Sequence, residues 1–170
     1  MTDLMVPAGA WRKLVTPAQS VTFRATKEMG SSVSVFEVIV PPGFDVGAHV
    51  HQHSQEFFYV LDGELDLLCF EPVKRTGDTW HHWESAKGDR VVRAAAGSCM
   101  FVPPGTPHAF RNATDKPVKM LFESFPSPAW NAISRASSNT VAKPSPTRPV
   151  DQVWRTELAD VAERVAYRTA

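Results

Sequence analysis

The chain has 170 residues, 43% of them hydrophobic, a length that suits one globular domain with a real core. Its formal net charge is zero, which leaves no basic surface for nucleic acid or for an anionic membrane. The first residues lack the charged and apolar regions of a secretion signal, and no stretch approaches the length of a membrane span, so we expect a cytoplasmic protein.

Residues 1–30 carry scattered apolar positions among prolines and polar residues, without a sustained helical or alternating period. We expect an irregular N-terminal arm with one or two short strands. The sequence VSVFEVIV at residues 33–40 then predicts a strand, which Pro41 and Pro42 end. Glu37 within it is a solvent-facing residue in the favoured interpretation, and a catalytic acid or base facing the interior in the alternative.

The next stretch, residues 43–63, places His49 and His51 one residue apart and Glu56 five residues later. Alternate side chains of an extended strand share one face, so the two imidazoles are expected to project together. A polar turn should follow, and Glu56 then begins the returning strand EFFYVL. Imidazole and carboxylate suit Fe2+, Mn2+, Ni2+, Cu2+ or Zn2+. The stretch therefore predicts three ligands of a divalent metal, built into a hairpin.

The returning strand also predicts which residues face the interior. If Glu56 points inward, strand alternation places Phe58 and Val60 on the same side. We expect Phe58 and Val60, together with Phe110, to bind substrate. His53 is a weak candidate for a catalytic or ligating residue, because the polar turn should break the alternation before it.

Residues 64–70 are expected to form the strand paired with EFFYVL, and an insertion at residues 71–90 follows, with Trp-His-His-Trp at 80–83. One interpretation is a lid that places aromatic surface and imidazole beside a substrate. We favour an extended hairpin whose tryptophans pack on the outside of the domain or on a partner subunit.

The two cysteines, Cys69 and Cys99, lie in apolar, strand-like surroundings. Their spacing fits no common zinc or redox motif. We therefore expect buried, reduced thiols at both positions.

A fourth metal ligand is expected because three ligands from one stretch rarely complete a six-coordinate sphere. Residues 97–112 supply a candidate in GSCMFVPPGTPHAFRN. This sequence predicts a short apolar strand, a Pro-Pro-Gly turn and then His108 at the head of another strand.

The two stretches resemble the paired motifs of the cupin superfamily, with every motif position present. The first, G-x5-H-x-H-x4-E-x6-G, is matched at Gly43, His49, His51, Glu56 and Gly63, and the second, G-x5-P-x-G-x2-H-x3-N, at Gly97, Pro103, Gly105, His108 and Asn112.

The resemblance implies an all-β double-stranded β-helix, a jelly-roll barrel, over residues 31–125. It implies one divalent transition metal per chain, with His49, His51, Glu56 and His108 as ligands. It also implies a homodimer, because N-terminal arms of dimeric cupins often pack on the neighbouring subunit.

The character of the chain changes after its last barrel strand, residues 118–125. Residues 126–149 are rich in proline and serine, which is typical of a linker. Apolar residues then recur at helical spacing over residues 150–170 and predict an amphipathic C-terminal helix appended to the barrel. This helix either simply packs at the end of a barrel or, in the less favoured alternative, gates the site.

Three neutral imidazoles and one carboxylate would leave a divalent metal with a net charge of about +1 and roughly two open positions. Both features favour an anionic, chelating small molecule such as an enolate or phenolate. Cupins of this kind resemble quercetin dioxygenases, polyketide cyclases, isomerases and lyases. We expect a metal-dependent oxidoreductase that uses dioxygen on a flavonol- or polyketide-like substrate. The alternatives are a non-redox cyclase or isomerase and a non-catalytic small-molecule-binding protein.

Overall fold

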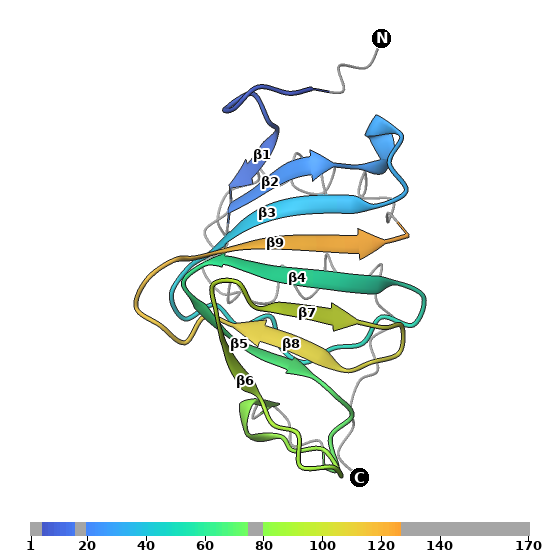
Figure 1. The fold of residues 1–170 in the computed structure, drawn as a ribbon, viewed down its shortest axis with the longest axis vertical. Coiled ribbons are helices and arrows are strands. Elements are labelled where there is room, and N and C mark those ends of the chain that lie inside the picture. The colour runs from blue at the N-terminus through green and yellow to red at the C-terminus, as the bar shows by residue number, and fades with distance from the viewer. Residues whose placement is uncertain (1–4, 16–19, 75–79, 127–170) are drawn as a thin grey trace, which may run out of the picture.

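The computed structural model describes residues 5–15, 20–74 and 80–126 as a stack of antiparallel strands (Figure 1). The described residues form nine strands and two short 3-10 helices. These elements are β1 Lys13–Val15, β2 Ser20–Ala25, η1 Lys27–Met29, β3 Ser34–Val40, β4 Gln55–Asp62, β5 Glu64–Cys69, η2 Trp80–His82, β6 Val92–Ala95, β7 Cys99–Val102, β8 His108–Arg111 and β9 Val118–Phe125.

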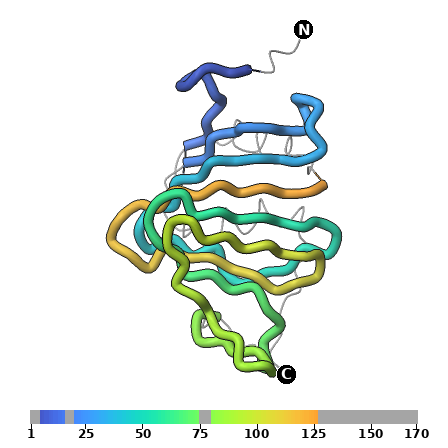
Figure 2. Tube along the Cα trace, in the orientation of Figure 1, coloured from blue at the N-terminus to red at the C-terminus, as the bar shows by residue number. Residues whose placement is uncertain are grey.

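The strands form two sheets that enclose one hydrophobic core. Sheet A has the order β1-β2-β3-β9-β4-β7, and sheet B has the order β6-β5-β8. The tube in Figure 2 shows the chain running back and forth across the molecule, with β9 (orange) lying between β3 and β4. This arrangement confirms the expected all-β, double-stranded β-helix, and the strands at 118–125 and near 33–40 lie where the sequence predicted them.

Strand alternation determines which residues enter the core. In β3, Phe36, Val38 and Val40 are buried, whereas the residues between them lie on the outer face of sheet A. The same alternation in β4 buries Phe58 and Val60 and leaves Tyr59 exposed. An apolar inner face and a more polar outer face are what an antiparallel sheet packed on one side requires.

One expected strand pairing is wrong. The strand after Gly63 was expected to pair with the strand before it, but β4 pairs with β7 and β9, and β5 pairs with β6 and β8. Gly63 therefore carries the chain from sheet A to sheet B. Its φ of 83° favours glycine, and a Cβ there would lie 2.9 Å from a methyl group of Val118. Closing a jelly roll requires such a crossing, because consecutive strands then belong to different sheets.

The N-terminal part contains the short strands that the sequence predicted, β1 and β2. Strand β2 pairs with β3 along its length, and its Val21 and Phe23 belong to the main core. In the insertion, Trp80 and Trp83 are buried with Leu68 and Ala109 in a second apolar cluster. Leu68 and Ala109 are cross-strand neighbours in sheet B, on the face opposite the main core. The tryptophans thus pack on the outside of the barrel, as the favoured interpretation expected.

The two thiols are free, as expected, but the expected burial is wrong for both. Cys69 is only partly buried, and its S–H donates to the carbonyl oxygen of Phe101 at 3.4 Å. Burial raises the pKa of Cys69. Cys99 is exposed because it begins β7 on the outward side of the alternation, opposite Tyr59.

The linker predicted at 126–149 and the helix predicted at 150–170 lie outside the described residues, apart from residue 126. The division of the chain into arm, barrel, linker and helix therefore stays a prediction. In the described part of the chain, no helix has the length and apolar character needed to cross a membrane.

Candidate metal centre

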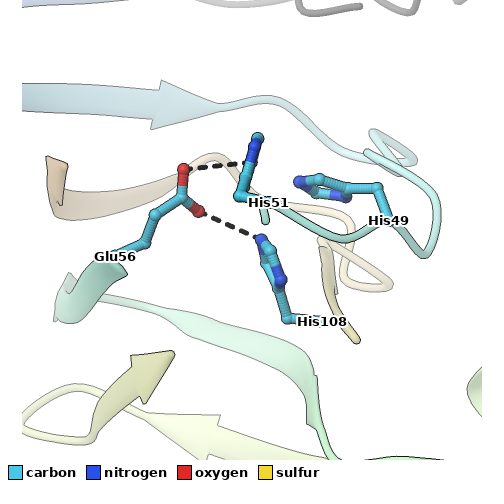
Figure 3. Close-up of side chains that lie close together, drawn as sticks. All are labelled: His49, His51, Glu56 and His108. Atoms are coloured by element: carbon cyan, nitrogen blue, oxygen red, sulfur yellow. Dashed lines mark hydrogen bonds and ion pairs between the residues drawn. The ribbon is translucent and has the colours of Figure 1, made fainter. Parts of the chain in front are cut away.

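Four side chains converge at one end of the space between the sheets. His49 and His51 come from the connection between β3 and β4, Glu56 is the second residue of β4, and His108 is the first residue of β8. One potential ligand atom from each lies within 4.8 Å of those from the other three (Figure 3). These are the four residues that the motifs predicted as ligands, and the cluster they form could hold a metal ion.

Backbone hydrogen bonds bring the two motifs together. The N–H of His49 donates to the carbonyl of His108, and the N–H of His108 donates to the carbonyl of His49, both at 3.0 Å. The N–H of Gly105 in the Pro-Pro-Gly turn donates to the carbonyl of His51 at 2.8 Å. Glu56 reaches the same point from sheet A, where it is paired with Val102 and Ser124.

The local structure around the two histidines differs from the predicted hairpin. His49 makes an isolated bridge with His108, and neither His49 nor His51 lies in a named strand. The first half of the motif runs beside β8 of sheet B, whereas Glu56 belongs to sheet A. The ligand set therefore spans the two sheets, and the geometry depends on how the barrel closes.

The outer ring nitrogens of two histidines are held by backbone carbonyls. His49 Nδ1 lies 2.9 Å from the Gly47 carbonyl oxygen, and His108 Nδ1 lies 3.0 Å from that of Thr106. A carbonyl can only accept, so in the neutral ring that a metal needs the proton would lie on Nδ1 and the lone pair on Nε2. This is the tautomer that metal-ligating histidines adopt. Among the described residues, His51 Nδ1 is buried without a hydrogen-bond partner.

The site favours the deprotonated forms that a metal needs. Burial lowers the pKa of His49 to about 3, and the neighbouring imidazole of His108 contributes to this. Burial works to raise the pKa of Glu56, but hydrogen bonds from His108 and His51 outweigh it and lower the value to about 2. Near neutral pH, His49 is therefore neutral and Glu56 is anionic, as metal ligation requires.

A bound cation would remove an unfavourable contact between the imidazoles and the carboxylate of Glu56. His108 Nε2 lies 3.0 Å from Glu56 Oε2, and His51 Nε2 lies 3.1 Å from Glu56 Oε1. A neutral imidazole carries one proton, and both ring nitrogens of His108 face acceptors, the Thr106 carbonyl oxygen and Glu56 Oε2, so with the proton on Nδ1 the lone pair of Nε2 would repel the carboxylate. A divalent ion between these atoms would turn the repulsion into ligation. The residues thus fit the metal that the donor set implies.

The other two sequence candidates lie away from this cluster. Glu37 is on the outer face of sheet A, where its carboxylate is 2.7 Å from Arg24 and 2.8 Å from Lys119. This supports the solvent-facing interpretation of Glu37. His53 is exposed and does not belong to the described ligand cluster, so the structure brings neither candidate to the centre.

The residues predicted to bind substrate are buried, but they differ in distance from the centre. The ring of Phe58 lies 6.2 Å from the ring of His108 and 5.7 Å from that of Phe110. Phe110 in turn stacks with Phe44 at 5.8 Å. Val60 is 1% exposed and pairs with Met120 deeper in the core. An aromatic wall therefore begins beside His108.

Sequence reasoning missed the acceptors that hold the histidines, and it missed Asp45. Asp45 Oδ1 accepts from the N–H of Gly47 at 2.7 Å, in the turn whose carbonyl holds His49. An Asp two residues ahead of a Gly is a signal of such an Asx-turn, and the sequence contains it. The carbonyl acceptors have no such signal, because every residue carries one.

Two curated relatives match this chain in sequence. An uncharacterised protein of Methanocaldococcus jannaschii is 32% identical over 97 residues, which cover 57% of this chain and 63% of that protein. Polyketide synthase CurC of Streptomyces cyaneus is 32% identical over 119 residues, which cover 69% of this chain and 60% of that protein. The chain thus spans about three fifths of the length of each relative.

Solved structures share the fold. Oxalate decarboxylase of Bacillus subtilis superposes with a TM-score of 0.50 at 20% identity, covering 68% of this chain and 27% of that chain. A conserved protein of Klebsiella pneumoniae with a double-stranded β-helix domain has a TM-score of 0.51 at 17% identity, covering 74% of this chain and 91% of that chain.

The family model for the cupin domain matches residues 36–122, which include both motifs and all four clustered side chains. That match extends over just over half of the 170 residues. Together with the two-sheet fold, it establishes that this chain belongs to the cupin family.

Proposed function

We propose that this chain is a metal-dependent enzyme that oxygenates an anionic, enolisable or phenolic small molecule of the flavonol or polyketide type. The observation that carries the proposal is the convergence of three imidazoles and one carboxylate within 4.8 Å. A divalent metal held there would polarise a substrate oxygen as a Lewis acid and, if redox-active, promote reaction of the electron-rich substrate with dioxygen.

The charge of the site supports an anionic substrate. Glu56 is the single carboxylate of the cluster, so a divalent ion would keep a net charge of about +1. The cluster is largely enclosed: Glu56 is 6% exposed, His51 7% and His108 0%. In such surroundings an uncompensated positive charge attracts an enolate or phenolate more strongly than it would in water.

The aromatic wall formed by Phe58, Phe110 and Phe44 supports a flat, unsaturated substrate. The centre of the Phe58 ring lies 6.2 Å from that of His108 and 5.7 Å from that of Phe110. Such rings exclude water from one side of the centre and offer their faces and edges to an aromatic or conjugated ligand.

The positions of the acid and base candidates support oxygenation over cyclisation. A cyclisation or isomerisation needs a general base that moves protons on carbon. Glu37 is paired with Arg24 and Lys119 on the outer face, and His53 is exposed. An oxygenation does not need such a base, because a substrate that binds as its anion has already lost its proton.

A second candidate is a non-redox cyclase or isomerase that acts on a polyketide-like compound. The observation that favours it is the similarity to polyketide synthase CurC over 69% of this chain. Such an enzyme would turn over without oxygen.

The deciding experiment combines metal analysis with turnover assays on the full chain. Protein expressed with Fe, Mn, Ni, Cu and Zn together is purified without a metal-binding tag, and its metal content is measured by plasma mass spectrometry. We expect a redox metal near one per chain, and oxygen uptake with a flavonol or a polyketide-like phenol.

Zinc alone, with product formed equally under nitrogen, would contradict oxygenation and support the cyclase. Ligand binding without any product would contradict both enzymes and support the non-catalytic alternative. The predicted homodimer is a separate proposal, which sedimentation of the full chain would check.

A further inference from the structure

The insertion is joined to the metal centre by a continuous series of hydrogen bonds. Nε1–H of Trp80 donates to both carboxylate oxygens of Asp45, at 3.0 and 3.1 Å. Asp45 Oδ1 accepts from the N–H of Gly47 at 2.7 Å. The carbonyl of Gly47 accepts from Nδ1–H of His49 at 2.9 Å. Two residues thus separate the indole of the insertion from a side chain of the centre.

The start of this series is rigid. Trp80 is 2% exposed and belongs to the apolar cluster on the outer face of sheet B with Leu68, Trp83 and Ala109. The guanidinium of Arg111 lies 5.9 Å from the centre of the Trp80 ring. An indole held on several sides has little freedom to rotate, so its N–H is aimed at one place.

The segment that contains Asp45 is paired with β8 on both sides of a turn. It runs beside β8, where Val46 N–H donates to the Phe110 carbonyl and Asn112 N–H donates to the Phe44 carbonyl. Between these bonds and His49, the chain turns at Gly47, whose φ is 75°. A left-handed residue breaks the regular pairing, so the Asp45 carboxylate supplies the hydrogen bond that fixes this turn.

We propose that Trp80 and Asp45 are positioning residues for His49: the insertion orients this imidazole by fixing the Gly47 carbonyl that accepts its Nδ1–H. The inference rests on the proposed metal centre and gives the insertion a role in it. Outer partners of metal-ligating histidines set ring orientation and basicity, and losing one typically weakens metal binding about 10- to 100-fold. His49 is partly buried whereas the other three residues are buried, so packing alone restrains its ring less.

The test is the Co2+ dissociation constant of the metal-free full chain, measured by calorimetry for the wild type and three variants. Trp80→Phe removes the indole donor and keeps an aromatic ring in the cluster. Asp45→Asn keeps the shape of the acceptor and removes its charge. Trp83→Phe is the matched control, because it alters the other tryptophan of the same cluster.

We expect Trp80→Phe and Asp45→Asn each to weaken Co2+ binding about tenfold, and Trp83→Phe to leave it unchanged. Affinity as in the wild type for both Trp80→Phe and Asp45→Asn would overturn the inference. An equal loss in Trp83→Phe would also overturn it, because a general loosening of the cluster would then be the cause.

A second measurement uses no metal. Long-range 1H–15N NMR of the metal-free chain reports the tautomer and hydrogen bonding of His49, which we expect Trp80→Phe to shift and Trp83→Phe to leave unchanged. An unshifted His49 signal in Trp80→Phe would contradict the inference even if that variant bound Co2+ less tightly. A wild type that binds no Co2+ would overturn the metal centre itself, whereas equal binding by wild type and Trp80→Phe would overturn only the positioning role.

Discussion

Two buried carboxylates, Glu56 and Asp66, have opposite partners. Asp66 is 5% exposed and lies between Arg93 and Arg111, which pair with it from the strands on either side. Glu56 is 6% exposed and faces two imidazole nitrogens, of His51 and His108. Asp66 is thus paired with two guanidinium groups that are always charged, whereas Glu56 faces two imidazoles, which together with a carboxylate form a typical ligand set of a divalent metal.

This difference distinguishes a structural ion pair, at Asp66, from a candidate ligand-binding site, at Glu56. Buried charges are stable when they are paired and hydrogen-bonded, as Asp66 is. A carboxylate surrounded by imidazoles of suitable tautomer is what a divalent transition metal requires. A cluster of charged residues alone would not distinguish the two, but the identity of the partners does.

The largest expected effect follows from removing the charge of Glu56. Glu56→Gln keeps the shape of the side chain, and we expect it to weaken Co2+ binding more than about 100-fold, beyond the range typical of outer partners. Added Co2+ at 100 times its dissociation constant should stabilise the wild type by about 2.7 kcal/mol and the variant much less. Calorimetry and thermal unfolding would measure both, and tight binding by Glu56→Gln would remove the distinction between the two carboxylates.

The matching change at Asp66 should affect stability and leave metal binding alone. Asp66→Asn removes charge-assisted hydrogen bonds, and we expect it to lower the free energy of unfolding by about 2 kcal/mol. Most of this should come from Arg111, since Arg93 is half exposed and its contribution is screened by solvent. Urea unfolding would measure the loss. An Asp66→Asn variant that unfolds like the wild type but binds Co2+ less tightly would contradict the structural role of Asp66.

The contribution of Asp66 should depend on pH with a definite sign. Burial works to raise its pKa, but the hydrogen bonds from Arg93 and Arg111 outweigh it and hold the pKa below the ordinary value of 3.8. The unfolded chain therefore binds a proton first as the pH falls. The stabilisation should be complete above pH 3.8 and disappear as the pH falls through the lower folded value. The free energies of unfolding of the wild type and of Asp66→Asn should converge as the pH falls through the folded pKa. A difference that stays constant down to strong acid would contradict this assignment.

The smallest expected effect is at His53, which is adjacent in sequence to the centre but exposed. We expect His53→Ala to retain metal content, Co2+ affinity and turnover. His51→Ala, two residues away, is the matched control and should lose metal. A loss of metal in His53→Ala would contradict the prediction that His53 takes no part in the metal centre.

The sequence predicted the fold class and the four clustered residues, because both depend on local signals. The alternation in VSVFEVIV assigns Phe36, Val38 and Val40 to one face without reference to any partner strand. The paired motifs hold the spacing of His49, His51, Glu56 and His108, and the cupin fold brings these together.

Local signals failed where a long-range contact decided the outcome. The turn at Gly63 indicated a hairpin, yet β4 and β5 belong to different sheets, because closing the barrel needs a crossing at this point. Cys99 is exposed although its neighbours are apolar, since the face of β7 that it occupies depends on the register with β4.

The sequence by itself determined which side chains could bind a metal and in what order they occur. Only the tertiary structure decided that the Gly47 and Thr106 carbonyls hold two of the imidazoles, and that Trp80 reaches Asp45 from 35 residues away. The physical reason is that side-chain identity and strand alternation can be read from a short stretch of sequence, whereas a backbone carbonyl is the same at every residue. It becomes a specific partner only when the fold places it within hydrogen-bonding distance.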